Sequence, residues 1–244
     1  MARKRRSYGR KSKPTPVRFK FLRILIRTLF WLLVIVLVFI ALFRWIDPPT
    51  TSALIQENFH QERWRDRDLI GFQWRDWDQI DPSMPLAIIA AEDQRFPRHH
   101  GIDFTELKRA WQERHRRVRG ASTITPQVAK NMFLWSGRTY FRKALEATIA
   151  VYIEIVWGKK RILEIYLNIV QFGPNVYGVE NAAQTYFGKP SNQLNRLESA
   201  RLAVVLPNPN TRSAIHASEY VVSRQRFILG QMNQLGGLSV IENL

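Results

Sequence analysis

The longest hydrophobic run lies near the start of the chain and predicts a membrane-spanning helix. Residues 28–43 contain no charged side chain, and residues 24–46 are interrupted only by Arg27 and Arg44. A helix of that length rises roughly 34 Å, enough to cross a hydrocarbon core of about 30 Å. A cleavable signal peptide is the alternative, but its apolar region would be shorter and small residues would follow it. Large and charged residues follow at 44–47 instead, so we predict a retained transmembrane helix at 24–46.

Helical periodicity dominates the chain from residue 85 onwards, and no alternating strand pattern competes with it. Asn195 and Glu198 have the spacing of a capping box, and Gly188 is placed to end the helix before it. The pattern predicts one compact, mainly α domain at 85–244. Its expected helices cover residues 85–93, 103–119, 126–134, 140–157, 160–168, 178–187, 195–205 and 219–234.

A polar, Trp-rich segment at 47–84 separates the two regions, and its sequence predicts no secondary structure. Pro48 and Pro49 end the first helix. Two pairs of aspartates, Asp66 with Asp68 and Asp76 with Asp78, have a spacing that can hold a divalent metal. Neither pair follows an apolar strand, so exposed loop carboxylates are the favoured interpretation.

The charge of the chain is concentrated at its start and predicts the topology. Lys and Arg total 37 against 20 Asp and Glu, for a net charge of +17. Residues 1–27 hold 11 of the basic side chains and no acidic one, which leaves a net charge of +6 for the rest. Basic flanks stay on the cytoplasmic side, so residues 1–23 are expected to form a cytoplasmic tail and the main domain to lie outside. A nucleic-acid arm is the weaker interpretation, and contact with anionic lipid is a secondary role.

The chain has no cysteine, which excludes disulfides, thiolate zinc sites and a cysteine nucleophile. The first candidate site is the acidic pair Glu92 and Asp93, which directly follows an apolar helix. Burial at such a helix end would raise a carboxylate's pKa and suit it to acid–base work. A water-exposed helix end is the alternative.

Two further clusters could bind an anion. Hydroxyls at Ser122, Thr123 and Thr125 precede a helix, where they could cap it or present backbone donors to an anion. Gln127 and Lys130 follow on one face of that helix.

Farther along, Arg138, Arg142 and Glu146 lie four residues apart with Lys143 beside them. They form either a surface ion pair or a cationic cradle for a diphosphate.

Five motifs in order resemble those of the peptidoglycan glycosyltransferases, whose module also forms the front half of bifunctional penicillin-binding proteins. Because the chain ends at Leu244, with no room for a transpeptidase, the monofunctional members are the expected match. Pro126 departs from the pattern, since the family usually has a glutamine there. The motifs are Glu92-Asp93-x-x-Phe96-x-x-His99-x-Gly101, Gly120-x-Ser122-Thr123-Ile124-Thr125-x-Gln127, Arg142-Lys143-x-x-Glu146, Ile162-Leu163-Glu164-x-Tyr166-Leu167-Asn168 and Ala182-Ala183-x-x-Tyr186-Phe187-Gly188-Lys189.

The resemblance implies a mainly α, lysozyme-like glycosyltransferase domain behind one N-terminal transmembrane helix. It implies polymerisation of lipid II into β-1,4-linked glycan, with inversion at the donor carbon and release of undecaprenyl diphosphate. Glu92 would be the base that deprotonates the acceptor hydroxyl, and Glu146 would have a supporting catalytic role. Cations would offset the charge of the leaving diphosphate, namely Lys130, Arg138, Arg142 and Lys143. The other residues expected to bind substrate are Asp93, Phe96, His99, Ser122, Thr123, Gln127 and Asn131.

The resemblance also implies partners and a location. The expected partners are lipid II, the growing glycan strand, membrane lipids and proteins of cell-wall synthesis and division, without nucleic acid. No cofactor is required, and a divalent Mg or Mn ion at the diphosphate is left open. The expected location is the bacterial cytoplasmic (inner) membrane, crossed once, with the catalytic domain on the periplasmic or outer side.

Alternatives remain at this point. A membrane-bound lysozyme-like hydrolase or lytic enzyme also uses a helix-borne glutamate, and a non-catalytic basic scaffold needs none. The apolar and basic mix at 104–117 could dip into the lipid headgroups or form an ordinary amphipathic core helix. Its residues of interest are Phe104, Leu107, Trp111, Arg114, Arg116 and Arg117.

Overall fold

The computed structural model describes residues 17–66, 68–113, 122–137, 139–216 and 218–244. It consists of two compact units, one ending at Leu42 and the other beginning at Phe43. Part of the predicted basic tail, Arg138, and the predicted headgroup contacts Arg114, Arg116 and Arg117 lie outside the described residues.

The first unit contains the predicted membrane helix. Helix α1 covers Val17–Leu42, and its segment Lys20–Leu42 is long and apolar enough to cross a membrane. Trp31, Leu32 and Leu33 follow one another and are all more than half exposed, so the helix is apolar on every side, as lipid contact requires. The helix ends at Leu42 and not at Ile46, and residues 43–46 form a turn that belongs to the second unit.

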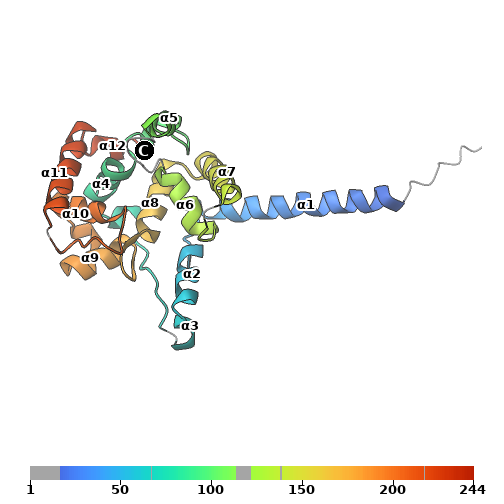
Figure 1. Ribbon diagram of the computed structural model, residues 1–244, viewed down its shortest axis with the longest axis horizontal. Coiled ribbons are helices and arrows are strands. Elements are labelled where there is room, and N and C mark those ends of the chain that lie inside the picture. Colours follow the sequence, from blue (N-terminus) through green and yellow to red (C-terminus); the bar gives the residue numbers. More distant parts are fainter. Residues whose placement is uncertain (1–16, 67, 114–121, 138, 217) are drawn as a thin grey trace, which may run out of the picture. The chain divides into compact units, whose positions relative to one another are not determined.

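Helices make up most of the second unit (Figure 1). The elements are α2 (Ser52–His60), α3 (Arg63–Asp66), η1 (Trp77–Gln79), α4 (Ser83–Glu92), η2 (Phe96–Arg98), α5 (Phe104–Glu113), α6 (Ile124–Phe133), α7 (Tyr140–Trp157), α8 (Lys159–Ile169), β1 (Gln171–Gly173), β2 (Val176–Tyr177), α9 (Val179–Phe187), η3 (Ser191–Gln193), α10 (Arg196–Val205), α11 (Glu219–Gln234) and α12 (Ser239–Glu242).

The predicted helices are confirmed with small shifts at their ends. The predicted bounds of α7 and α11 match the structure, and the capping box of Asn195 and Glu198 is present. Gly188 ends α9 in the left-handed conformation, as expected. Helix α5 is described only to Glu113, so the end predicted for it lies outside the described residues.

Helix α4 forms the centre of the domain and carries the first candidate site at its end. Residues 84–90 are all buried, because the sequence offers no polar side chain on any face there. The helix packs against α8, α10, α11 and α12, and Figure 1 shows it among the last three. Helix α8 joins this group to α6 and α7, since it contacts α4, α6 and α7. The end of α4 is therefore held between the two groups of helices.

The segment at 47–84, for which the sequence predicted no structure, is ordered by single side chains. Asn58 exchanges two hydrogen bonds with the backbone of Ile70, and buried Asn168 does the same with the backbone of Arg75. Helix α2 packs against α6. The segment is thus part of the domain surface, although its amphipathic pattern is too weak to predict this.

The sequence also missed a short hairpin. Strands β1 and β2 are antiparallel, with Gln171 opposite Tyr177 and Gly173 opposite Val176. Two- and three-residue strands are too short to produce a readable alternation.

Candidate active site

Glu92 is the last residue of α4 and projects from the buried helix toward α6. Its Oε2 accepts a hydrogen bond from Nε2 of Gln127 at 3.1 Å. The same nitrogen donates to the carbonyl of Ser122 at 3.3 Å, and Oε1 of Gln127 accepts from the hydroxyl of Tyr166 at 3.2 Å. Glu92 itself is half-buried, and its carboxylate is held from inside the protein by Gln127.

Burial raises the pKa of Glu92 above its ordinary value. The hydrogen bond from Gln127 and the positive charges of Arg224 and Arg212 lower this pKa, while the neighbouring charge of Asp93 raises it further. Burial is the largest of these effects. A carboxylate destabilised in this way is a stronger base than one in water.

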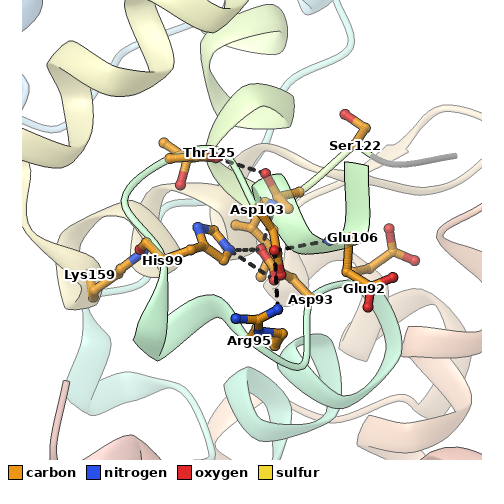
Figure 2. A network of polar contacts seen from close by, with 12 residues as sticks. Glu92, Asp93, Arg95, His99, Asp103, Glu106, Ser122, Thr125 and Lys159 are labelled. Carbon is orange, nitrogen blue, oxygen red and sulfur yellow. Dashed lines mark hydrogen bonds and ion pairs between the residues drawn. The ribbon is translucent and has the colours of Figure 1, made fainter. Parts of the chain in front are cut away.

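Asp93, by contrast, is buried in a network of internal contacts (Figure 2). Nε2 of His99 lies 3.0 and 2.9 Å from its two oxygens. The backbone N–H of Ile124, the first residue of α6, donates to Oδ2 at 3.2 Å. Asp93 therefore ties the end of α4 to the start of α6, and the predicted alternative of a water-exposed acidic pair is wrong for this residue.

The predicted hydroxyl cap before α6 is wrong in its details. The hydroxyl of Thr123 donates to the carbonyl of Gly101 at 2.8 Å, and that of Thr125 donates to Glu154 at 2.5 Å. The first free N–H of the helix is bound by Asp93. Both threonine side chains are buried, so among the three predicted hydroxyls only half-buried Ser122 is accessible.

Phe96 and His99 support the loop between α4 and α5 from inside. Phe96 is fully buried, and the ammonium group of Lys159 lies 4.2 Å from the centre of its ring. Lys159 also donates to the carbonyl of His99 at 2.6 Å and to Glu154 at 2.8 Å. These buried positions, like those of Asp93 and Thr123, suit residues that position the site from within.

The second part of the site is a cationic group at the start of α7. Nη1 of Arg142 lies 2.7 Å from Oε2 of Glu146, and Lys143 pairs with the other oxygen of the same carboxylate. Arg142 also donates to the carbonyl of Gly137. Arg142 and Glu146 are both buried, so the alternative of an ordinary surface pair is wrong. Glu146 is fully occupied in holding the two cations.

A hollow of about 400 Å³ opens beside this group. Lys130, on α6, and Arg142, on α7, face it together. Partial burial lowers the pKa of Lys130, as do the charges of Arg142 and Lys143, while Glu146 raises it. The remaining lining residues are Trp135, Ser136 and Gly137.

Helix α6 joins the two parts of the site. Gln127 contacts Glu92, and Lys130 follows one helical turn later, about 4.5 Å farther along the axis. Glu92 does not line the hollow itself. Asn131, half-buried, lies beside Lys130 on the same helix, and Arg138 lies outside the described residues.

Sequence reasoning missed several residues around Glu92. Tyr166 belongs to the fourth of the five family motifs, but nothing in the sequence placed its hydroxyl next to Gln127. Arg212 and Arg224 belong to no motif. Arg224 comes near Glu92 because α11 packs on α4, and the charge of Arg212 acts from the segment between α10 and α11.

Metal ligands do not gather in the described part of the chain. None of its His, Asp and Glu side chains forms a group of three that could hold a metal ion. Asp68 instead pairs with Arg63 at 2.7 Å, and Asp76 accepts from the indole of Trp74 at 3.1 Å.

Known proteins resemble this chain over most of its length. It is 42% identical to a protein of Pseudomonas fluorescens over 93% of this chain and 95% of that one. It is 46% identical to a Xylella fastidiosa protein over 83% of this chain and 85% of that one. It is also 46% identical to a Marinomonas protein over 85% of this chain and 88% of that one. All three are named biosynthetic peptidoglycan transglycosylase. The sequence model of the family described as transglycosylase matches residues 61–233. The predicted fold class, mainly α with a lysozyme-like domain, is thereby confirmed, and the chain belongs to the transglycosylase family.

Proposed function

We propose that this protein polymerises lipid II into β-1,4-linked glycan strands, inverting the donor carbon and releasing undecaprenyl diphosphate. Family membership carries the coarser statement that the chain is a glycosyltransferase of peptidoglycan synthesis. The observation that carries the finer one is that α6 bears both Gln127, which contacts half-buried Glu92, and Lys130, which faces the cationic hollow.

Glu92 is the base in this proposal. Inversion requires the acceptor's 4-hydroxyl to attack the donor carbon from the face opposite the leaving diphosphate, and a base must take the hydroxyl proton as the bond forms. The bonding electrons of the donor C–O bond leave with the diphosphate. A desolvated carboxylate at the accessible end of a rigid helix suits the proton transfer.

The hollow beside α7 is proposed to bind the diphosphate. Arg142 offers forked contacts to phosphate oxygens, and Lys130 and Lys143 add point charges. Glu146 positions Arg142 and Lys143 and takes no proton, because both its oxygens already bind cations. Preorganised cations are worth several kcal/mol against the charge that develops on the leaving group. Arg138 remains a proposed member of this group.

The remaining predicted site residues fall into two classes. We assign Ser122 and Asn131, which are half-buried, to contact with the sugars or diphosphate. Asp93, Phe96, His99 and Thr123 are buried and hold the end of α4 and the start of α6 in place.

The proposed location is the outer face of the cytoplasmic membrane, with α1 as the anchor. The ring of Phe43, the first residue after α1, lies 5.9 Å from that of Phe133 and 6.5 Å from that of Trp157, measured between centroids. Arg161 donates to the carbonyls of Phe43 and Ile46. The chain thus enters the domain at the end of α7.

The outward side of α7 is apolar. Phe141 and Ile155 are more than two-thirds exposed, and Val151 lies on the same face at helical spacing. Phe104 of α5 is also exposed, which supports the proposed contact of α5 with lipid headgroups. The side chains of Leu107 and Trp111 lie outside the described part of the structure. These surfaces support membrane lipids as partners.

Other proposed partners are the growing glycan strand and proteins of cell-wall synthesis and division, and nucleic acid is not one. The reaction as proposed needs no cofactor bound by the protein. A Mg or Mn ion would reach the site on the substrate's diphosphate, and chelation of free metal tests whether the rate depends on it.

The testing experiment is incubation of the purified full-length protein in detergent with labelled lipid II, with Glu92→Gln as control. Glycan strands that muramidase digests are expected from the wild type alone. Muropeptide fragments released from preformed wall would instead indicate a lytic hydrolase. If the protein forms neither strands nor fragments, the enzymatic assignment is overturned.

Arg142→Ala separates the two enzymes independently. A hydrolase of cross-linked glycan has no diphosphate to hold, so its rate should scarcely change. The proposed synthase should lose most of its rate. An unchanged rate of strand synthesis would contradict the assignment of the hollow.

A further inference from the structure

A buried tyrosine hydroxyl reaches the active-site amide from the side away from Glu92. Tyr166 lies on α8 and is fully buried. Its hydroxyl donates to Oε1 of Gln127 at 3.2 Å, and Nε2 of the same amide donates to Glu92 at 3.1 Å. The contacts form one chain, Tyr166 to Gln127 to Glu92, across α8, α6 and α4.

The direction of this chain is fixed by the groups at its ends. The carbonyl of Ser122 can only accept, so the NH₂ end of the Gln127 amide must face it and, beside it, Glu92. The oxygen end must then face Tyr166, which can donate. A reversed amide would set two acceptors against each other at Ser122 and leave the tyrosine hydroxyl without its acceptor.

We propose that Tyr166 is a positioning residue for the catalytic base: its hydroxyl locks the Gln127 amide in the orientation that donates to the Glu92 carboxylate. The inference rests on the proposed function, because it takes Glu92 as the base. It changes the expected role of Gln127 from substrate ligand to the link between Tyr166 and Glu92.

The hydrogen bond from Gln127 is one of several effects that set the pKa of Glu92. Burial and the neighbouring Asp93 favour the neutral acid and raise the pKa of Glu92. Arg224 of α11 and Arg212, between α10 and α11, oppose them, as does the hydrogen bond from Gln127. The effect of Gln127 depends on which way its amide is turned, because its NH₂ end donates to the carboxylate whereas its oxygen end would face another acceptor.

Tyr166 is suited to hold that orientation at every working pH. Burial raises its pKa well above the ordinary value, and the charges of Glu92 and Asp93 raise it further. Its hydroxyl therefore stays protonated and remains a donor while Glu92 titrates.

Tyr166→Phe removes the hydroxyl and keeps the ring that fills the core. Only the carbonyl of Ser122 then holds the direction of the Gln127 amide, so the amide turns its oxygen toward Glu92 more often and the ionised carboxylate loses part of its donor. The acid limb of the rate profile should move to higher pH. The rate on the high-pH plateau should fall by about five- to tenfold, as expected for one hydrogen bond.

Tyr186→Phe provides a matched control. The Tyr186 hydroxyl donates to the carbonyl of Phe172 at 3.3 Å, so this variant also loses one internal tyrosine hydrogen bond. Its acid limb should coincide with that of the wild type.

The experiment measures the pH dependence of lipid II polymerisation by the full-length protein in detergent. It compares the wild type, Tyr166→Phe, Tyr186→Phe, Gln127→Leu and the double variant of Tyr166 and Gln127. Gln127→Leu should shift the limb in the same direction as Tyr166→Phe, and the double variant should shift it no further than Gln127→Leu. A loss of rate at all pH values without a shift in Tyr166→Phe, or an additive shift in the double variant, would overturn the inference.

A second measurement separates this inference from the proposed function. The titration of the Glu92 carboxyl carbon can be followed by NMR in ¹³C-glutamate-labelled protein and assigned by its loss in Glu92→Gln. The midpoint should be higher in Tyr166→Phe than in the wild type even if lipid II is not the substrate. An inactive wild type would overturn the proposed function, whereas equal midpoints would overturn the role of Tyr166.

Discussion

Glu92 and Asp93 are neighbours in the sequence, but their carboxylates contact different parts of the protein. Glu92 accepts a hydrogen bond from the side chain of Gln127 and is half-buried. Asp93 is buried and accepts from His99 and from the backbone of Ile124. The helix ends between them, which turns one side chain toward the accessible surface and the other into the protein.

Neutralising Asp93 should therefore mainly lower stability, whereas neutralising Glu92 should mainly lower activity. Asp93→Asn is expected to cost about 1–3 kcal/mol, because an NH₂ group replaces one of the two oxygens that accept from His99 and Ile124. Glu92→Gln should change the free energy of unfolding by about 0.5 kcal/mol or less, while abolishing synthesis. Chemical denaturation of both variants in detergent measures this. Equal destabilisation would contradict the different placements.

The rate of synthesis should depend on a group that titrates above the ordinary range of a glutamate. Burial raises the pKa of Glu92, and the proposed base works only when ionised. Activity should therefore be lost as the pH falls through that raised value. The pH profile of kcat/KM measures it. A limb at or below the ordinary value of 4.5 would contradict the assigned environment.

Glu180 should make stability depend on pH in acid. Burial raises the pKa of this residue, but hydrogen bonds from Arg75 and Ser191 outweigh burial and hold it at about 2. A group whose pKa is depressed by folding stabilises the fold at pH values above its ordinary pKa, here 4.5. This stabilisation is lost as the pH falls toward 2. The wild type should lose on the order of 2 kcal/mol more than Glu180→Gln across that range. Chemical denaturation at a series of pH values measures this. If the free energy of unfolding changes with pH equally in the two proteins, the ion pair contributes nothing.

Two glycines with the same φ should differ in their tolerance of alanine. Gly158 and Gly178 both have φ of +80°, a conformation that costs an alanine about 1–3 kcal/mol. A Cβ at Gly178 would lie 2.6 Å from the carbonyl oxygen of Asn168, whereas one at Gly158 would meet nothing within 4 Å. Gly178→Ala should therefore cost at least about 1–3 kcal/mol more than Gly158→Ala. Thermal unfolding of both variants provides the comparison.

Most helices could be predicted because their apolar positions recur over several turns. The bounds of α7 and α11 were predicted correctly, and α4 was recognised from an unbroken apolar run. The hairpin at 171–177 could not be predicted, since five strand residues give no pattern. The order in 47–84 depends on single side chains such as Asn168, whose partners lie far away in the sequence.

The candidate site was predictable in residue identity and only partly in arrangement. Glu92 and Arg142 were identified from motifs and Lys130 from its spacing after Gln127, and the structure brings Lys130 and Arg142 to one hollow. Which hydroxyls are accessible was not predictable, because Thr123 and Thr125 bond to Gly101 and Glu154. Nor was the approach of Arg224, which depends on the packing of α11 against α4.

The central claim, that Glu92 removes the acceptor's proton, is tested most directly by separating substrate binding from turnover. The affinity for lipid II and the rate of glycan synthesis should be measured on the same preparations of wild type and Glu92→Gln. We predict that the variant binds lipid II within about threefold of the wild type and loses at least about a hundredfold in rate, the range of general-base catalysis. Retention of more than a tenth of the rate, with binding unchanged, would contradict the role of Glu92.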